Sequence, residues 1–267
     1  MNGTVRHAFL LLSAVWLASP LNGPAAFAAD DITLYLNQLP HRLMQGSGKQ
    51  YDLFLEEILA DSPMKISLEP APLTRSKTSF LGDEKSCLFP TNLRAMRVSD
   101  DVANRLVTSE QVDIVSLRLY TAGKASPDAR IADFEPERVG YIRGSGAIHA
   151  LGKNADRFVP IESEEQLIRM VELGRIDAFV GHHPDTALAL DQLNMPDALH
   201  VSPLNFMNLR FPVTFICHDN AVGHRFLNAV NPRILDMRLN GRLREILGPH
   251  AEFRLSEEPK DPGPFTE

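Results

Sequence analysis

The chain has 267 residues, of which 44% are hydrophobic and 23% charged, and its formal net charge at neutral pH is −7. An acidic chain lacks the basic surface that attracts nucleic acid, so we expect no nucleic-acid partner. The overall charge does not exclude a local basic pocket for a small anion.

Residues 1–28 have the three parts of a secretory signal peptide. Arg6 supplies the positive charge, Ala8–Ala18 is apolar apart from Ser13, and Ala26-Phe27-Ala28 fits the cleavage rule. A membrane anchor is disfavoured because the apolar run is shorter than the roughly 20 residues that cross a bilayer. We therefore expect cleavage near Ala28 and a soluble protein exported to the periplasm.

The next part of the chain alternates strand and helix patterns. The apolar spacing predicts strands at Asp31–Leu36, Lys65–Glu69 and Cys87–Phe89, and helices at Tyr51–Ala60 and Thr74–Leu81. This order is typical of a parallel sheet covered by helices.

A crossing between two lobes is expected after this unit. Val112–Tyr120 has the composition of a strand, and Thr121–Pro127 is small, polar and flexible. We place the first crossing in Thr121–Pro127, so that lobe 1 ends at residue 122.

A second alternating unit follows. It contains predicted strands at Val139–Ile142, Phe158–Ile161 and Ile176–Val180, with a glycine-rich turn, Gly144-Ser145-Gly146, after the first. Ser163 has capping-box spacing before a helix, and Gly174 stands where a left-handed C-terminal residue is wanted.

The chain then returns to the first lobe. Pro203–Arg210 is the expected return crossing, and Phe211–His218 is a strand. Helical spacing extends from Phe226 to Leu247, with Pro232 expected to break or kink the helix and Gly241 to mark another break. Residues 256–267 are acidic and proline-rich, which predicts a disordered tail.

Three segments of the second unit resemble the type 2 periplasmic solute-binding proteins that serve polar amino-acid ABC transporters. These are VGYIRGSGA, VPIESEEQL and LGRIDAFVG. LFPTNLRA resembles the family's strand followed by Thr-x-x-Arg, and FLNAVNPRILDMRLNGRLREILG its closing helix. The resemblance extends to about Pro249. It implies an α/β fold with two lobes, each a mostly parallel sheet flanked by helices, joined by two hinge strands. Lobe 1 would comprise residues 29–122 and 207–255, and lobe 2 residues 123–206.

The resemblance also implies a set of ligand-binding residues in the cleft between the lobes. Thr91 and Arg94 occupy the Thr-x-x-Arg positions, where the arginine grips a ligand carboxylate, and a guanidinium suits that task because it donates in a bidentate fork. Gly144, Ser145 and Gly146 form the turn that holds an anion. Arg75 could face the same cleft or be a solvated charge at its rim.

His182 departs from the family pattern. It stands where amino-acid binders have an aspartate for the ligand ammonium group, and a histidine cannot reproduce that attraction. A carboxylate or other anion is therefore a more plausible ligand than a standard amino acid, although His182 could instead be a surface residue beside His183.

The two cysteines, Cys87 and Cys217, lie in strand-like segments. Their number permits either a disulfide in an oxidising compartment or two buried thiols. In the family's fold the return strand lies beside the third strand of lobe 1, so the resemblance implies that these cysteines are neighbours and can form a disulfide.

The resemblance implies a non-enzymatic, monomeric protein that captures a small polar or anionic solute, amino-acid-like or a carboxylate, for the membrane permease of an ABC transporter. No cofactor or metal motif is present in the sequence. Two alternatives stay open: a dehydratase-like periplasmic enzyme with His182 or a nearby glutamate as general acid or base, and a ligand-sensing partner of a membrane receptor.

Overall fold

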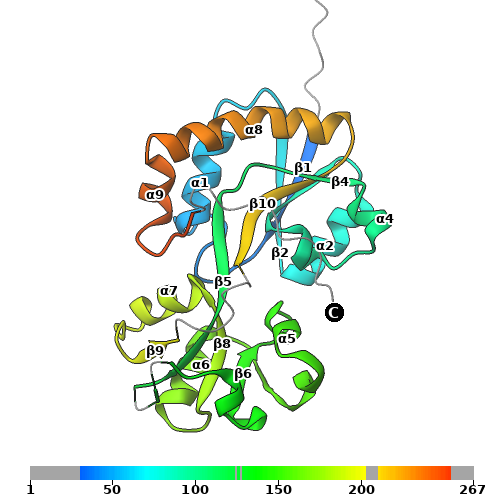
Figure 1. Ribbon diagram of the computed structural model, residues 1–267. Helices are drawn as coiled ribbons and strands as arrows, with labels where there is room; N and C mark the ends of the chain where they lie inside the picture. Colours follow the sequence, from blue (N-terminus) through cyan, green and yellow to red (C-terminus); the bar gives the residue numbers. More distant parts are fainter. Residues whose placement is uncertain (1–30, 124, 127, 203–209, 254–267) are drawn as a thin grey trace, which may run out of the picture.

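The computed structural model describes residues 31–253 apart from residues 124, 127 and 203–209. This part of the chain folds into two lobes, and a long strand runs from one lobe into the other (Figure 1). The predicted signal peptide, the tail from residue 256 and most of the return crossing at Pro203–Arg210 lie outside the described residues. No helix within these described ranges is long and apolar enough to span a bilayer.

Lobe 1, formed by residues 31–116 and 210–253, is built on strands in the order β2-β1-β3-β10. β1 runs parallel to β2 and β3, and β10 runs antiparallel to β3. The strands are β1 (Asp31–Asn37), β2 (Lys65–Ala71), β3 (Ser86–Thr91), β4 (Leu106–Thr108) and β10 (Arg210–His218). The helices are α1 (Gln50–Leu59), α2 (Leu73–Gly82), α3 (Leu93–Met96), α4 (Asp100–Ala103), α8 (Ala221–Leu239) and α9 (Arg242–Leu247).

Lobe 2, formed by residues 117–202, continues from β5 with the order β5-β8-β6-β7. β6 is parallel to β7 and β8, whereas β5 is antiparallel to β8. The strands are β5 (Asp113–Ala122), β6 (Val139–Ile142), β7 (Val159–Ile161), β8 (Ala178–His183) and β9 (Leu199–Val201). The helices are α5 (Ala147–Ala150), α6 (Glu164–Glu172) and α7 (Asp185–Gln192), with short 3-10 turns at Ile131–Asp133, Pro136–Arg138 and Gly152–Arg157.

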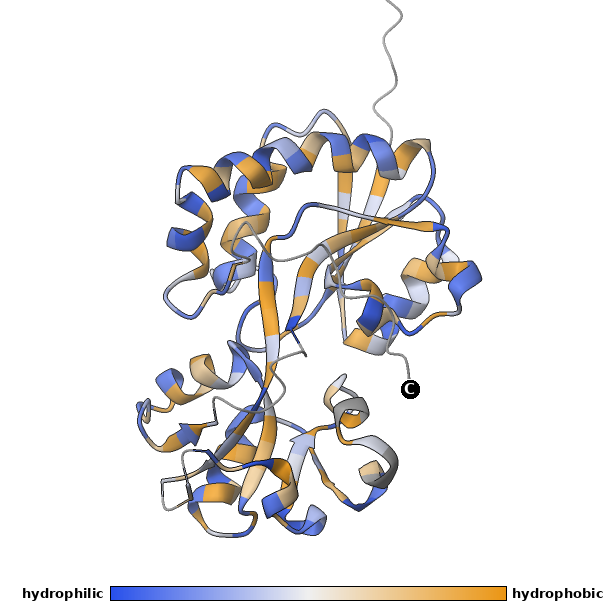
Figure 2. Cartoon of the chain, viewed as in Figure 1, coloured by the Kyte–Doolittle hydropathy of each residue, from blue (hydrophilic) through white to orange (hydrophobic). Residues whose placement is uncertain are grey.

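Each lobe has apolar side chains on both faces of its sheet. In lobe 1 the larger cluster lies under α1, α8 and α9, and a smaller one centred on Phe80 and Leu88 lies on the other face. Lobe 2 repeats this arrangement around Phe179 and around Val180. Figure 2 shows the matching pattern on α8, whose ribbon alternates between hydrophobic and hydrophilic bands. Each lobe therefore has its own hydrophobic core.

β5 carries the chain from lobe 1 into lobe 2, and β10, the first described element after lobe 2, pairs with β5 beside that crossing. β5 pairs with β10 over residues 113–116 and with β8 over residues 116–121, so the chain changes lobe inside the strand. The expected crossing at Thr121–Pro127, with lobe 1 ending at residue 122, is therefore too late by several residues. A strand that continues through the crossing has no turn residues there, so its composition does not mark the boundary.

A disulfide joins the first segment of lobe 1 to the returning segment. Cys87 on β3 and Cys217 on β10 are opposite each other, with Cα atoms 4.1 Å apart and their sulfurs bonded. The implied pairing is thus present in the structure, and both residues are fully buried.

Candidate functional site

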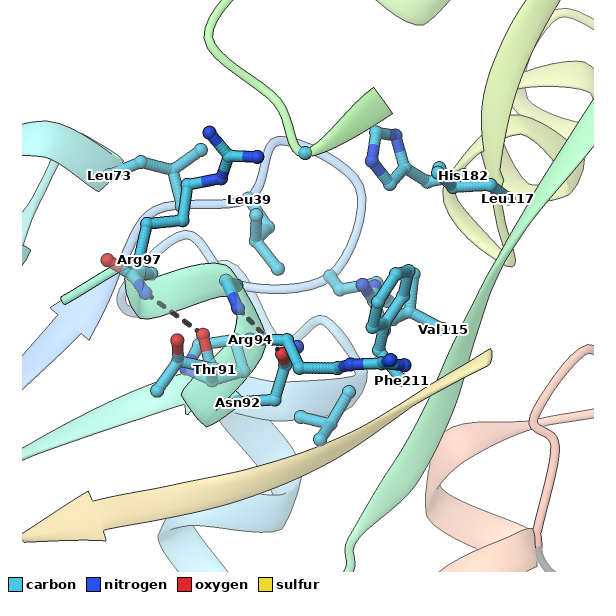
Figure 3. A pocket seen from close by; sticks show the side chains of 16 residues that line it. Leu39, Leu73, Thr91, Asn92, Arg94, Arg97, Val115, Leu117, His182 and Phe211 are labelled. Carbon is cyan, nitrogen blue, oxygen red and sulfur yellow. Dashed lines mark hydrogen bonds between the residues drawn. The ribbon is translucent and has the colours of Figure 1, made fainter. Parts of the chain in front are cut away.

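A pocket lies between the lobes, next to β5 and β10. It encloses about 170 Å³, which is below the range of about 300–1,000 Å³ usual for drug-sized ligands and therefore suits a small solute. Sixteen residues line it, and Figure 3 shows their side chains. They are Asn37, Leu39, Arg42, Leu73, Pro90, Thr91, Asn92, Arg94, Ala95, Arg97, Val115, Leu117, Gly146, His182, Phe211 and Val213.

Thr91 and Arg94 are placed by the carboxyl end of β3. Thr91 ends the strand, and Asn92 caps α3 by accepting a hydrogen bond from the Ala95 backbone N–H at 2.8 Å. This turn brings Arg94 to the pocket wall, where its guanidinium carbon lies 5.8 Å from the centre of the Phe211 ring. The carboxyl ends of parallel strands are the usual ligand-binding edge of such sheets.

Two more side chains that can carry a positive charge, Arg97 and His182, line the pocket from different lobes. Arg97 follows α3 with a left-handed backbone (φ 47°), and His182 comes from β8 in lobe 2. Figure 3 shows the Arg97 guanidinium and the His182 ring pointing into the pocket from opposite sides. Among the described lining residues there is no aspartate or glutamate. The pocket therefore combines an apolar wall with a basic rim.

His182 is supported by a buried carboxylate behind it. Its Nδ1 lies 3.8 Å from Oε1 of Glu164, which is 6% exposed and accepts a hydrogen bond from the Thr186 hydroxyl at 2.9 Å. The reading of His182 as an uninvolved surface residue is not supported, because its side chain is only 19% exposed and lines the pocket.

The glycine-rich turn contributes less than the resemblance implies. Gly146 lines the pocket, but Gly144 and Ser145 are not among the lining residues. The Ser145 hydroxyl accepts a hydrogen bond from the Ala147 backbone N–H at 3.2 Å, so it is used within its own turn. Arg75 is exposed on α2 and also lies outside the pocket lining, which agrees with a solvated charge.

Arg42 and Arg97 line the pocket although the sequence did not single them out. Arg42 lies in the loop after β1, and its only sequence signal is its position beyond the carboxyl end of a predicted strand. Arg97 was one of several basic residues in the same stretch, with nothing to distinguish it.

Polar contacts also join the lobes behind the pocket. The ring of His41 in lobe 1 is 3.3 Å from the Gln192 side chain and 3.5 Å from the carboxylate of Glu165, both in lobe 2. His250 lies 2.7 Å from Asp191 across the same boundary. The described ranges contain no group of three or more histidine, cysteine, aspartate or glutamate side chains that could hold a metal ion.

Comparison with protein-family models and with curated protein sequences finds no match. Solved structures do match. The L-cystine solute receptor of Neisseria gonorrhoeae, in its unliganded open conformation, is 14% identical, with a TM-score of 0.58 over 84% of this chain and 96% of that one. An ancestral arginine-binding protein bound to arginine is 13% identical, with a TM-score of 0.59 over 81% and 96%. A histidine kinase sensor domain with similarity to periplasmic binding proteins is 13% identical, with a TM-score of 0.61 over 82% and 94%.

The chain has the type 2 periplasmic-binding-protein fold. The matches extend over 94–96% of the length of these structures. Identities of 13–14% establish the fold alone, so function has to be argued from the pocket.

His183, at the end of β8, predicts a pH dependence of folding stability. Burial lowers its pKa from 6.5 to about 4, with further contributions from the charge of Arg118 and from His250. Because the unfolded chain then binds a proton that the folded chain excludes, stability present above pH 6.5 is lost as the pH falls toward 4. Nε2 of His183 is 3.6 Å from Glu252, but the Glu252 carboxylate also pairs with Arg118 and Arg210. We therefore expect burial, and not this contact, to determine the direction of the pKa shift of His183.

The expected loss from this residue is about 2 kcal/mol between pH 7 and pH 5. Urea unfolding at both pH values measures it, and His183→Gln should show a correspondingly smaller loss than the wild type. Equal losses in the two proteins would contradict the assignment.

Proposed function

We propose that this protein binds a small anionic solute, such as a carboxylate, in the interlobe pocket and closes its lobes around it. The observation that carries the proposal is the pocket lining: Arg94, Arg97 and His182 surround an apolar space, and the described lining contains no acidic side chain. A guanidinium meets a carboxylate in a bidentate fork, and exclusion of water strengthens that contact.

The remaining wall favours a solute with an apolar part. Leu39, Leu73, Leu117 and Phe211 line the space beside the basic groups. Burial of apolar surface contributes about 25 cal/mol per Å², so an alkyl or aryl body would add to the affinity.

We further propose that the protein acts in the periplasm and delivers the solute to the permease of an ABC transporter. The sequence pattern of residues 1–28 supports export, and a two-lobed clamp supports ligand-dependent closure that a permease can recognise. Loss of uptake of the labelled solute in a deletion strain tests the transport role. Unchanged uptake would contradict it.

Thermal-shift screening of the purified protein against amino acids, carboxylates, oxoanions and oligosaccharides tests the ligand class. Carboxylates should raise the melting temperature in a concentration-dependent way. A response confined to neutral sugars or to cations would contradict the proposal.

Arg94→Ala is expected to weaken binding of the carboxylate hits by about 10- to 100-fold, because a hydrogen-bonded contact to a charged group contributes about 1.5–3 kcal/mol. Isothermal titration calorimetry measures this change. Arg75→Ala is the matched control, since it removes an exposed arginine that lies outside the pocket lining. Equal affinities for Arg94→Ala and Arg75→Ala would show that Arg94 does not bind the solute.

A further inference from the structure

Arg42 connects the lobes at the back of the pocket. It belongs to lobe 1 and is 4% exposed, yet it lines the pocket. Its guanidinium donates to the carboxylate of Asp185 in lobe 2 through two hydrogen bonds, Nε to Oδ1 at 3.0 Å and Nη2 to Oδ2 at 2.8 Å. Asp185 is only three positions beyond His182, at the start of α7. The ion pair therefore lies immediately behind the lobe 2 wall of the site.

The third nitrogen of Arg42 has buried partners in lobe 1. Nη1 lies 3.2 Å from Oδ2 of Asp113 and also contacts the Tyr51 hydroxyl, which donates to the same Oδ2 at 2.9 Å. The other oxygen of Asp113 accepts the backbone N–H groups of Ile114 and Glu252. Arg42 is thus held on both sides by carboxylates, with Tyr51 beneath its charged end.

These contacts decide which charge the pocket presents. Asp113 and Asp185 both pair with Arg42, but neither lines the pocket, whereas Arg42 does. The carboxylates of Asp113 and Asp185 are already paired with Arg42, so an ammonium group on a ligand could not pair with them directly. To reach a carboxylate it would have to displace a bidentate, buried guanidinium, and a buried charge without a partner is costly.

We propose that Arg42 is a specificity-determining residue that acts as a built-in cation, so that the site takes a small carboxylate with an apolar body and no ammonium group. This inference rests on the proposed function and narrows its ligand class. Arg42 takes the counter-ion role that an amine on the ligand would otherwise have. Arg94 and Arg97, which also belong to lobe 1, line the pocket and would bind the ligand carboxylate. His182, on the lobe 2 side of the lining, carries no negative charge that could pair with an ammonium group.

A matched pair of probes tests the ligand class on the wild-type protein. Pentanoate and norvaline share the carboxylate and the alkyl chain and differ in the ammonium group. Isothermal titration calorimetry should give a dissociation constant for pentanoate that is lower by about tenfold or more, because the norvaline ammonium group would be buried without a counter-ion. A lower dissociation constant for norvaline, or no binding of pentanoate, overturns the proposed class.

A second experiment tests the role of Arg42 itself. In Arg42→Ala the two carboxylates lose their cation, and methylguanidinium, which has the same charged group, should bind saturably and raise the melting temperature. Wild type should show no saturable response, and Arg42→Ala/Asp185→Asn should show a smaller one. Circular dichroism verifies that Arg42→Ala is folded. If the folded variant does not bind methylguanidinium, the proposal that Arg42 acts as a built-in cation is wrong. If Arg42→Ala does not fold, the pentanoate and norvaline comparison on the wild type still decides the ligand class.

The two proposals fail in different ways. If norvaline binds more tightly than pentanoate and this binding is lost in Arg94→Ala, the cleft still binds anions. The proposed function then stands, and only the proposal that the site excludes amines is wrong. Absence of binding for every carboxylate in the screen would remove the proposed function, and the methylguanidinium titration would still report on Arg42.

Discussion

Replacement of both Cys87 and Cys217 by alanine is expected to lower the free energy of unfolding by about 4 kcal/mol. The disulfide closes a loop with a sequence separation of 130, and the chain-entropy model gives about 5 kcal/mol for a loop of that length. Both sulfurs lie in the lobe 1 core, where alanine leaves small voids, whereas residual structure in the reduced unfolded chain reduces the loss. Equilibrium urea unfolding of the wild type and the double variant measures the difference.

The reduced wild type is the control for this prediction. Unfolding in the presence of a thiol reductant should show nearly the stability of the double variant, since both remove the same cross-link. The m-value should rise in both, because the unfolded chain becomes more extended. A loss below about 1 kcal/mol in the double variant would mean that the cross-link hardly restricts the unfolded chain.

The order of elements could be predicted because most have strong local signals. Ser163 caps α6 by accepting a hydrogen bond from the Gln166 N–H, and Gly174 has the predicted positive φ of 66°. Gly241 separates α8 from α9 as expected. These features depend on neighbouring residues alone, so the sequence contains the information.

The expected break or kink at Pro232 shows where local reasoning is insufficient, because α8 continues through this residue without a break. A proline inside a helix costs about 3 kcal/mol, but Val230 and Ile234 on either side are buried in the lobe 1 core. Full burial of such side chains contributes about 1.5–3 kcal/mol each, which is enough to offset the cost. Tertiary packing thus overrides the local preference.

The site was only partly predictable for the same reason. Thr91, Arg94, Gly146 and His182 follow short motifs and do line the pocket, whereas Gly144, Ser145 and Arg75 match or adjoin such motifs without lining it. Arg42 and its partners come from separate places along the chain, and 143 residues separate Arg42 from Asp185. Only the packing of one lobe against the other brings Arg42 and Asp185 together, so no sequence window reports them.

Arg42→Ala is expected to lower the free energy of unfolding at pH 7 by about 3 kcal/mol, because removal of one partner leaves a buried charge uncompensated. Burial disfavours the charged form of Arg42. The pKa of Arg42 is nevertheless raised, because this effect is outweighed by Asp185, Tyr51 and Asp113. Asp185 can regain water if the lobes separate, but Asp113 is 1% exposed within lobe 1 and cannot. We therefore expect most of the loss to come from Asp113, together with a larger radius of gyration in small-angle X-ray scattering.

The pH dependence of the variant identifies Asp113 as the cause. Burial already raises the pKa of Asp113 in the wild type, and Arg42 opposes this rise. Without Arg42 the folded-state pKa should rise further above the unfolded value, so the folded variant takes up a proton that the unfolded chain does not. The variant therefore loses stability as the pH rises through the folded-state pKa of Asp113 and regains it as the pH falls. The difference in free energy of unfolding between the wild type and Arg42→Ala should shrink as the pH is lowered from 7 to 5. Arg42→Ala/Asp113→Asn should lack this pH dependence because its amide does not titrate. A deficit that stays constant with pH in Arg42→Ala would show that loss of packing, and not an uncompensated carboxylate, destabilises the variant.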